Sequence, residues 1–351
     1  MRRHRPIVVG VCLALGSALS FGITIPVLGW AGAGVGPFMT AALLYTGASI
    51  AALAQKPVVR ESGVALARSS GPTLLVMGVA GAAAAPTLLA WGLQSIGPVT
   101  GGLLLNLEAV WTVVLARIAF GEFLGHRVVF ALVMMVIGGG LIATRGQDGL
   151  QFSLVGVIAV LGATIAWAID NTASRRLAEV RPLTVVAAKG AIGATLTLLL
   201  AVAFHEAFPA MWRAALLLLA GATGYGASLR LYLLAQRKIG AARTASVFAL
   251  APFIGAGLGL VLRPAQVTWV TGAAAALFAA GIALHLSERH AHRHRHEGLE
   301  HEHTHRHDDG HHLHRHPEPA PIEHSHPHSH EPLDHQHEHG LDVHHGHVHV
   351  H

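Results

Sequence analysis

The sequence predicts an all-α membrane protein with ten transmembrane helices, arranged as two inverted five-helix repeats, followed by a disordered His-rich tail. Composition, the spacing of apolar runs and an internal repeat support this prediction. Of the 351 residues, 52% are hydrophobic and only 12% are charged, a balance typical of membrane proteins that cross the bilayer several times. The 40 glycines fit the same class, because small residues let membrane helices approach one another closely.

The apolar residues fall into runs of a length that can cross a bilayer, which requires about 20 residues as a helix. Ten such runs cover roughly residues 7–29, 35–54, 73–93, 99–119, 127–144, 152–172, 183–204, 212–235, 241–262 and 267–286.

The positive charges between these spans predict how the chain is oriented in the membrane. The N-terminus and every second turn carry 13 lysines and arginines, whereas the opposite turns carry only three. Loops rich in Lys and Arg remain on the cytoplasmic side. We therefore expect a multi-pass protein of the inner (plasma) membrane with both termini in the cytoplasm, which an even number of spans requires.

An internal repeat divides the membrane part into two halves. Ile96-Gly97 before the fourth span matches Ile239-Gly240 before the ninth, and each pair precedes a long apolar run. Because each repeat holds five spans, the halves insert with opposite orientation, as in many secondary transporters. The predicted domains are residues 1–149 for the first repeat, 150–289 for the second and 290–351 for the tail.

Four segments carry a resemblance to a known family: GPFMTAALLYTGASIAAL (36–53), LLLNLEAVWTVVLARIAFGE (103–122), WAIDNTASRRLAEVRPLTVVAAKG (167–190) and GAARTASVFALAPFIGAGLGLVL (240–262). With the ten-span layout, they resemble EamA-type proteins of the drug/metabolite transporter superfamily. The resemblance implies a ten-helix inverted-repeat fold and the export of a small metabolite, but it does not indicate which one.

Glu108 is the most informative charged residue of the spans, since it lies about halfway along the fourth. A charge at the centre of a membrane helix costs about 2.5–3.5 kcal/mol on insertion scales. Low-dielectric surroundings favour a neutral carboxyl group, so Glu108 could bind and release a proton or bind a cationic substrate. The alternative is a structural carboxylate held by neighbouring helices. Thr112 lies one turn further along the same face, and Asn106 is predicted to make an interhelical hydrogen bond.

Asp170 and Asn171 lie near the cytoplasmic end of the sixth span, and Lys189 lies about two turns into the seventh. A hairpin of the two spans would bring Asp170 and Lys189 to similar depth, and intramembrane charges usually pair. Such a pair could be structural or could act as a gate. Arg117, in the cytoplasmic third of the fourth span, either extends to the interface or forms part of a positive vestibule.

The tail has a different composition from the membrane part. Residues 290–351 hold 24 of the 28 histidines, together with 11 acidic residues, and too few apolar residues for a core. Neutral imidazole binds zinc, nickel, cobalt and copper ions, and repeated His-x-His clusters of this density indicate metal binding. The candidate ligands are His290, His292, His294, His296, His301, His303, His305, His307, His311, His312, His314, His316, His324, His326, His328 and His330.

These observations favour a secondary transporter, with proton-coupled export of a small metabolite and a tail that binds a divalent transition metal. One alternative is an exporter of a nickel, cobalt or zinc ion, or of a metal complex, fed by the tail. Another is a metal-sensing membrane scaffold that transports nothing. The spans hold no His-x-x-x-Asp pair or carboxylate cluster suited to a dication, which places metal export second.

The remaining expectations concern partners and chemistry. The expected partners are the lipid bilayer and a small-molecule or metal substrate, and a homodimer is compatible with the sequence. No basic face is interleaved with aromatics, so nucleic acid is not an expected partner. Transport is expected to need no cofactor. No nucleophile lies beside a base at one membrane depth, so an enzyme is not expected.

Overall fold

The computed structural model contains two compact units, the helical part up to Glu288 and the tail unit Arg289–Gly340. It describes residues 5–55, 63–120, 124–144, 153–174, 177, 180, 182–239, 241–262 and 268–286 of the helical part, and residues 290–296, 300–305, 324–329 and 333–339 of the tail.

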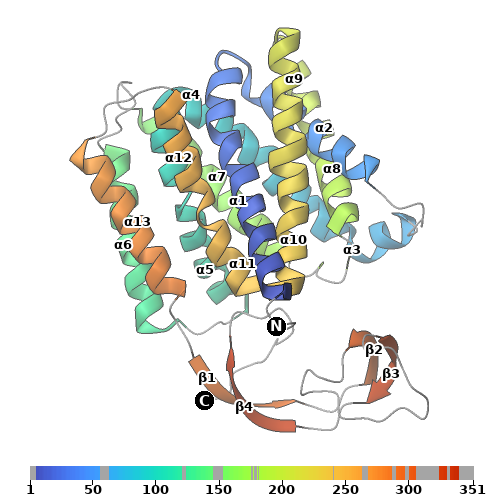
Figure 1. The fold of residues 1–351 in the computed structure, drawn as a ribbon. Coiled ribbons are helices and arrows are strands. Elements are labelled where there is room, and N and C mark those ends of the chain that lie inside the picture. Colours follow the sequence, from blue (N-terminus) through green and yellow to red (C-terminus); the bar gives the residue numbers. More distant parts are fainter. Residues whose placement is uncertain are drawn as a thin grey trace. The chain divides into compact units, whose positions relative to one another are not determined.

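Helices account for nearly all of the described membrane part (Figure 1). In chain order they are α1 (Arg5–Ala31), α2 (Pro37–Ala54), α3 (Gly63–Met77), the π-helix η1 (Gly78–Ala84), α4 (Ala85–Leu104), α5 (Leu107–Phe120), α6 (His126–Thr144), α7 (Leu154–Ser174), α8 (Pro182–Ala203), α9 (Met211–Ala220), the π-helix η3 (Gly221–Ala227), α10 (Ser228–Ile239), α11 (Ala241–Phe248), α12 (Ala251–Leu262) and α13 (Trp269–Leu286).

All ten predicted spans are found as helical segments. Among the described residues, seven helices are long and apolar enough to cross a membrane without interruption. One of them, Ser70–Leu104, joins the third span to the start of the fourth across a sharp turn at Gly97, where φ is +76°. Glycine adopts this left-handed conformation without a Cβ penalty. The rest of the fourth span, the ninth and the tenth are formed by the shorter helices α5, α11, α12 and α13.

The helices pack in a pattern that repeats between the two halves. The helix α2 packs on its counterpart α8, and α6 packs on its counterpart α13 at the edge of the bundle (Figure 1). The contact of α4 with α7 is matched by that of α10 with α1, and the contact of α5 with α7 is matched by that of α12 with α1. Each contact between a helix of the first repeat and a helix of the second thus has a counterpart in which the two repeats have changed roles. Two related, inverted repeats produce this pattern.

Two π-helical segments occupy equivalent places in the two repeats. The segments η1 and η3 begin at Gly78 and Gly221 and have the same length, and their separation equals that between Gly97 and Gly240. π-Helices are rare and interrupt the regular hydrogen-bond ladder, often at functional sites. Each repeat therefore carries one irregular turn within its third span.

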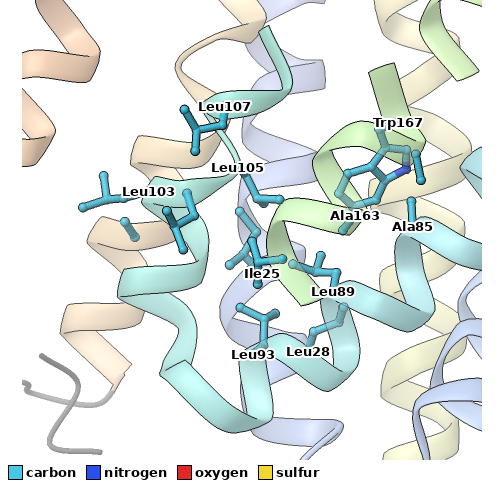
Figure 2. Packing of buried hydrophobic residues seen from close by; sticks show 14 of the residues in the cluster. Ile25, Leu28, Ala85, Leu89, Leu93, Leu103, Leu105, Leu107, Ala163 and Trp167 are labelled. Atoms are coloured by element: carbon cyan, nitrogen blue, oxygen red, sulfur yellow. The ribbon is translucent and has the colours of Figure 1, made fainter. Parts of the chain in front are cut away.

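The fourth and ninth spans are both broken near their middle, although their apolar sequences predicted long continuous helices. The first break, at Leu105 and Asn106, separates α4 from α5, and Figure 2 shows Leu103 and Leu107 on its two sides. Asn106 was expected to bond to another helix, but its Nδ2 donates to the carbonyl of Leu103 at 2.9 Å. It therefore satisfies a backbone group that the break exposes. The second break precedes Pro252 in α12, where proline removes a helical donor.

Glycines allow helices of the two repeats to pack with their backbones in direct contact. A Cβ added at Gly221 of η3 would overlap the backbone of Leu44 in α2, and one added at Gly47 of α2 would overlap the backbone of Leu218 in α9. Elsewhere, Ser17 of α1 and Ser228 of α10 each donate a hydroxyl to the other's carbonyl, at 2.8 and 2.9 Å. Such small-residue contacts are the usual way in which membrane helices associate.

The described residues of the tail are assigned to four short strands. The strand β1 (His290–His296) pairs antiparallel with β4 (Leu333–His339), and β2 (Glu300–His305) pairs antiparallel with β3 (His324–Ser329). The His-x-His repeat has the period of two residues that a strand requires, so histidine meets histidine along both ladders. The opposed positions are 290 and 339, 292 and 337, 294 and 335, 301 and 328, 303 and 326, and 305 and 324.

The crossing of α2 and η3 predicts a sharp steric penalty. Gly221→Ala should lower the free energy of unfolding by about 2 kcal/mol, because the added methyl group has no room beside the Leu44 backbone. Equilibrium unfolding in detergent measures the loss. Gly257→Ala in α12 is the matched control, since no heavy atom lies within 4 Å of its added Cβ. Equal stability of the two variants would contradict this account of the crossing.

Candidate functional site

One face of α7 carries polar and aromatic side chains at the centre of the helix bundle. Trp167, Asp170 and Asn171 lie within about one turn, so their side chains share a face of the helix. Trp167 and Asp170 are buried, while Asn171 is exposed. The helix α7 packs against α5 and η1, and Asp170 on this face reaches Lys189 of α8.

The ion pair that the spacing predicted between Asp170 and Lys189 is present. Lys189 Nζ donates to Asp170 Oδ2, and both side chains are buried, with 7% and 6% of their surface exposed. The pair joins α7 to α8. The other carboxylate oxygen, Asp170 Oδ1, is buried and has no hydrogen-bond partner among the described residues. It is therefore an acceptor that a bound molecule could use.

Glu108 lies in the first turn of α5, directly after the helix break, and is half-buried. Its Oε1 accepts a hydrogen bond from Asn171 Nδ2 at 2.6 Å. A helix N-terminus carries partial positive charge, so the break places this carboxylate where a negative charge is favourable. The contact joins α5 to α7. Sequence reasoning did not foresee it, because Asn171 was grouped with its neighbour Asp170.

The six residues expected to serve transport are not all brought together. Glu108 and Asn171 form one pair, Asp170 and Lys189 form another, and Glu108 interacts electrostatically with both members of the second pair. Thr112 is half-buried one turn beyond Glu108, and Arg117 lies exposed in the last turn of α5.

The π-helix η1 supplies a backbone acceptor beside the ion pair. The carbonyl of Gly81 accepts hydrogen bonds from Tyr45 Oη at 2.6 Å and from Trp167 Nε1 at 3.1 Å. A Cβ at position 81 would overlap the carboxyl group of Asp170. Because position 81 is glycine, the carboxyl group of Asp170 can lie against the same backbone segment to which Tyr45 and Trp167 donate hydrogen bonds.

Further aromatic rings pack against Tyr45 and Trp167, which donate to this acceptor, and sequence reasoning missed them. Phe21 of α1 packs edge-on against Trp167 (5.9 Å between ring centroids) and Tyr225 (5.6 Å), and Tyr225 packs against Tyr45 (5.3 Å). Phe248 of α11 contacts Phe21, and it also contacts Tyr232 of α10. We call these six rings the aromatic cluster.

A signal for the cluster was present in the sequence. The glycines at 78 and 81 recur at 221 and 224, with the same spacing as the repeat. Tyr225 follows the last of these glycines. Its ring is buried, and its hydroxyl has no hydrogen-bond partner among the described residues. Aligning the two repeats so that these glycines coincide would have shown that the segments of both π-helices share a glycine pattern.

The tail histidines are only partly within the described residues. The strands β1, β2 and β3 contain ten of the candidate ligands. Those at positions 307, 311, 312, 314, 316 and 330 lie outside the described residues. Across the part of the chain that the structure describes, no group of three or more His, Cys, Asp or Glu residues could hold a metal ion.

Paired repeats with broken helices and polar pairs at the centre are typical of multi-pass membrane transporters. A sequence profile of the EamA-like transporter family matches residues 8–144 and again 154–287. The chain therefore belongs to the EamA-like transporter family, one of transporters rather than enzymes.

Two further comparisons agree with this assignment. An uncharacterized transporter of Methanothermobacter thermautotrophicus is 25% identical over 213 residues, or 58% of this chain. The match spans 60% of that relative's length. A crystal structure covering 81% of this chain and 98% of its own matches with a TM-score of 0.55 at 21% identity. This last likeness concerns the fold alone.

The ion pair predicts a strong asymmetry between single and double variants. Lys189→Met leaves Asp170 as an uncompensated buried charge and should cost about 3–5 kcal/mol of stability. Combining it with Asp170→Asn removes both charges and should restore most of that loss. Unfolding in detergent measures both values. If the double variant were as unstable as the single one, the two side chains would not be energetically coupled.

Proposed function

We propose that the protein exports a small metabolite in exchange for protons, with Glu108 as the coupling carboxylate. The observation that carries this proposal is the contrast between the two central carboxylates. Asp170 is paired with a lysine, whereas Glu108 is held by the neutral amide of Asn171. A carboxylate without a paired cation can gain or lose a proton without leaving an unmatched charge on a partner.

The surrounding helices offer a way to couple that proton to movement. Glu108 follows the break in the fourth span, and Asn171 connects it to α7. A break in a membrane helix allows the two halves to move separately, and transporters commonly place their sites at such breaks. Protonation of Glu108 would change the charge at the contact between α5 and α7. The contact is therefore suited to favour one of two arrangements of the repeats.

The orientation predicted from the loops puts the tail in the cytoplasm, where we propose that it binds a divalent transition metal. The density of His-x-His repeats in the tail supports this role, because neutral imidazole is a good ligand for these ions.

A metal exporter fed by the tail is the second candidate, favoured by the 24 histidines that the tail contains. At the centre of the bundle, however, a dication would have to compete with Lys189 for Asp170. The donor set there is two carboxylates and an amide, with a fixed positive charge beside them. This arrangement suits an organic solute better than a bare metal ion.

Glu108→Gln should abolish export, because it removes the titratable group and keeps the shape of the side chain. A host strain lacking the protein would be complemented with the full chain, Glu108→Gln, or a chain ending at Arg289. Mass spectrometry would then compare the metabolites of cells and medium and the zinc, nickel, cobalt and copper content of the cells.

Each outcome of this comparison is distinct. Metabolite release that depends on Glu108 supports the proposal. A fall in one metal that depends on Glu108 and weakens on truncation would favour metal export instead. If Glu108→Gln changed neither metabolites nor metals while truncation altered metal content, the protein would act as a metal-sensing scaffold.

Metal binding by the tail should follow the protonation of imidazole. Purified full chain should bind zinc or nickel at pH 7.5 and lose most of it below about pH 6.5, where protons compete for the ligands. Equilibrium dialysis with each metal measures the loss, and the chain ending at Arg289 is the control. Equal binding by the two chains would contradict a role for the tail.

A further inference from the structure

The central site combines excess negative charge, unpartnered acceptors and aromatic faces, and these three properties together indicate a class of substrate. This inference rests on the proposed function, because it names what the same site would carry. The three properties come from Glu108, the Asp170–Lys189 ion pair and the aromatic cluster.

Among the described residues, the charge balance of the site is negative when Glu108 is ionised. Two carboxylates there face one lysine, which already donates to Asp170. The charged groups that interact with Glu108 are Asp170 and Lys189, and its hydrogen-bond donor, Asn171, is neutral. A solute carrying one positive charge would balance the site, whereas a carboxylate would add to the repulsion.

The site also has acceptor atoms that lack donors. Asp170 Oδ1 and the Tyr225 hydroxyl are buried without hydrogen-bond partners among the described residues, and Glu108 interacts electrostatically with Tyr225. An unpartnered buried polar atom is costly, and a ligand that supplies donors removes the cost. An ammonium group carries three donors and accepts none.

The aromatic cluster supplies the remaining part of the recognition. Its rings come from α1, α2, α7, η3, α10 and α11, so both repeats contribute. Phe21 lies nearly perpendicular to Trp167, at 76°, and to Tyr225, at 66°. Aromatic faces attract cations, and the same rings offer apolar contact to the body of a ligand.

We propose that the protein carries a metabolite with one protonated amine on an apolar or aromatic body and with no carboxylate. The ammonium group lies between Glu108 and Asp170, and the body lies against the aromatic cluster. Proton and amine then compete for the same carboxylate, which gives exchange of one for the other.

A matched series of probes tests this assignment. The purified full chain in lipid nanodiscs would be titrated calorimetrically with 2-phenylethylamine, 2-phenylethanol, phenylalanine and 3-phenylpropanoate, which share one ring and differ in charge. The amine should bind at least about tenfold more tightly than the other three. Binding of the alcohol or of either carboxylate as tight as that of the amine would overturn the proposal. So would the absence of amine binding up to millimolar concentration.

Variants distinguish recognition from loss of folding. Glu108→Gln should weaken amine binding at least about tenfold, and Tyr225→Phe should weaken it by a smaller factor because the ring remains. Thermal melting without ligand shows whether each variant is folded. Phe204→Leu is the control, since this ring stacks on Phe38 outside the aromatic cluster, and its amine binding should equal that of the unaltered chain. Unchanged amine binding in folded Glu108→Gln would also overturn the proposal.

The result is independent of the export experiment. If export requires Glu108 but no amine binds, proton-coupled transport stands and the substrate is of another class. If the amine binds through Glu108 but no metabolite is exported, the site recognises amines and the proposed transport function fails.

Discussion

The requirement that every polar group in the hydrocarbon layer be satisfied within the protein governs this structure. Water cannot compensate an unpaired carbonyl or charge there. The buried charges of Asp170 and Lys189 therefore pair across α7 and α8. The backbone carbonyl of Gly81 is satisfied by Tyr45 and Trp167, and the break after Leu104 is satisfied in part by Asn106. The irregular turn η1 and the break between α4 and α5 each have side chains that donate hydrogen bonds to their backbone.

The inverted repeat makes these irregularities occur in pairs. The π-helical turns lie in the third span of each half, and the breaks lie in the fourth span of each. The halves are not identical in chemistry, however. Glu108 begins α5 after the first break, whereas Ala251 begins α12 after the second. The fold therefore repeats while the chemistry does not: among the described residues, the first repeat contributes Glu108 to the centre of the bundle and the second contributes the Asp170–Lys189 ion pair.

The sequence predicted the fold well because the membrane simplifies the problem. A helix that spans hydrocarbon requires a long apolar run, so the ten spans and the repeat could be read directly from composition and spacing. The pairing of Asp170 with Lys189 could also be predicted, because the two residues lie in adjacent spans at similar depth. The helix breaks were missed, since neither Leu105 nor Leu250 differs in hydropathy from the residues around it. The tail was predicted to be disordered from its low apolar content, and its His-x-His period of two residues is that of a strand.

The sequence by itself determined the class of protein, the number of spans, the repeat and the position of Glu108. These properties depend on the order of residues along the chain and on the energetics of transfer into lipid. Only the tertiary structure decided that Asn171 contacts Glu108 rather than remaining with Asp170, and that rings from both repeats gather around Gly81. Those contacts join residues far apart in the chain. They depend on which helices pack together and on how close glycine allows them to come; the recurring glycines mark the irregular turns, but they do not specify which side chains meet there.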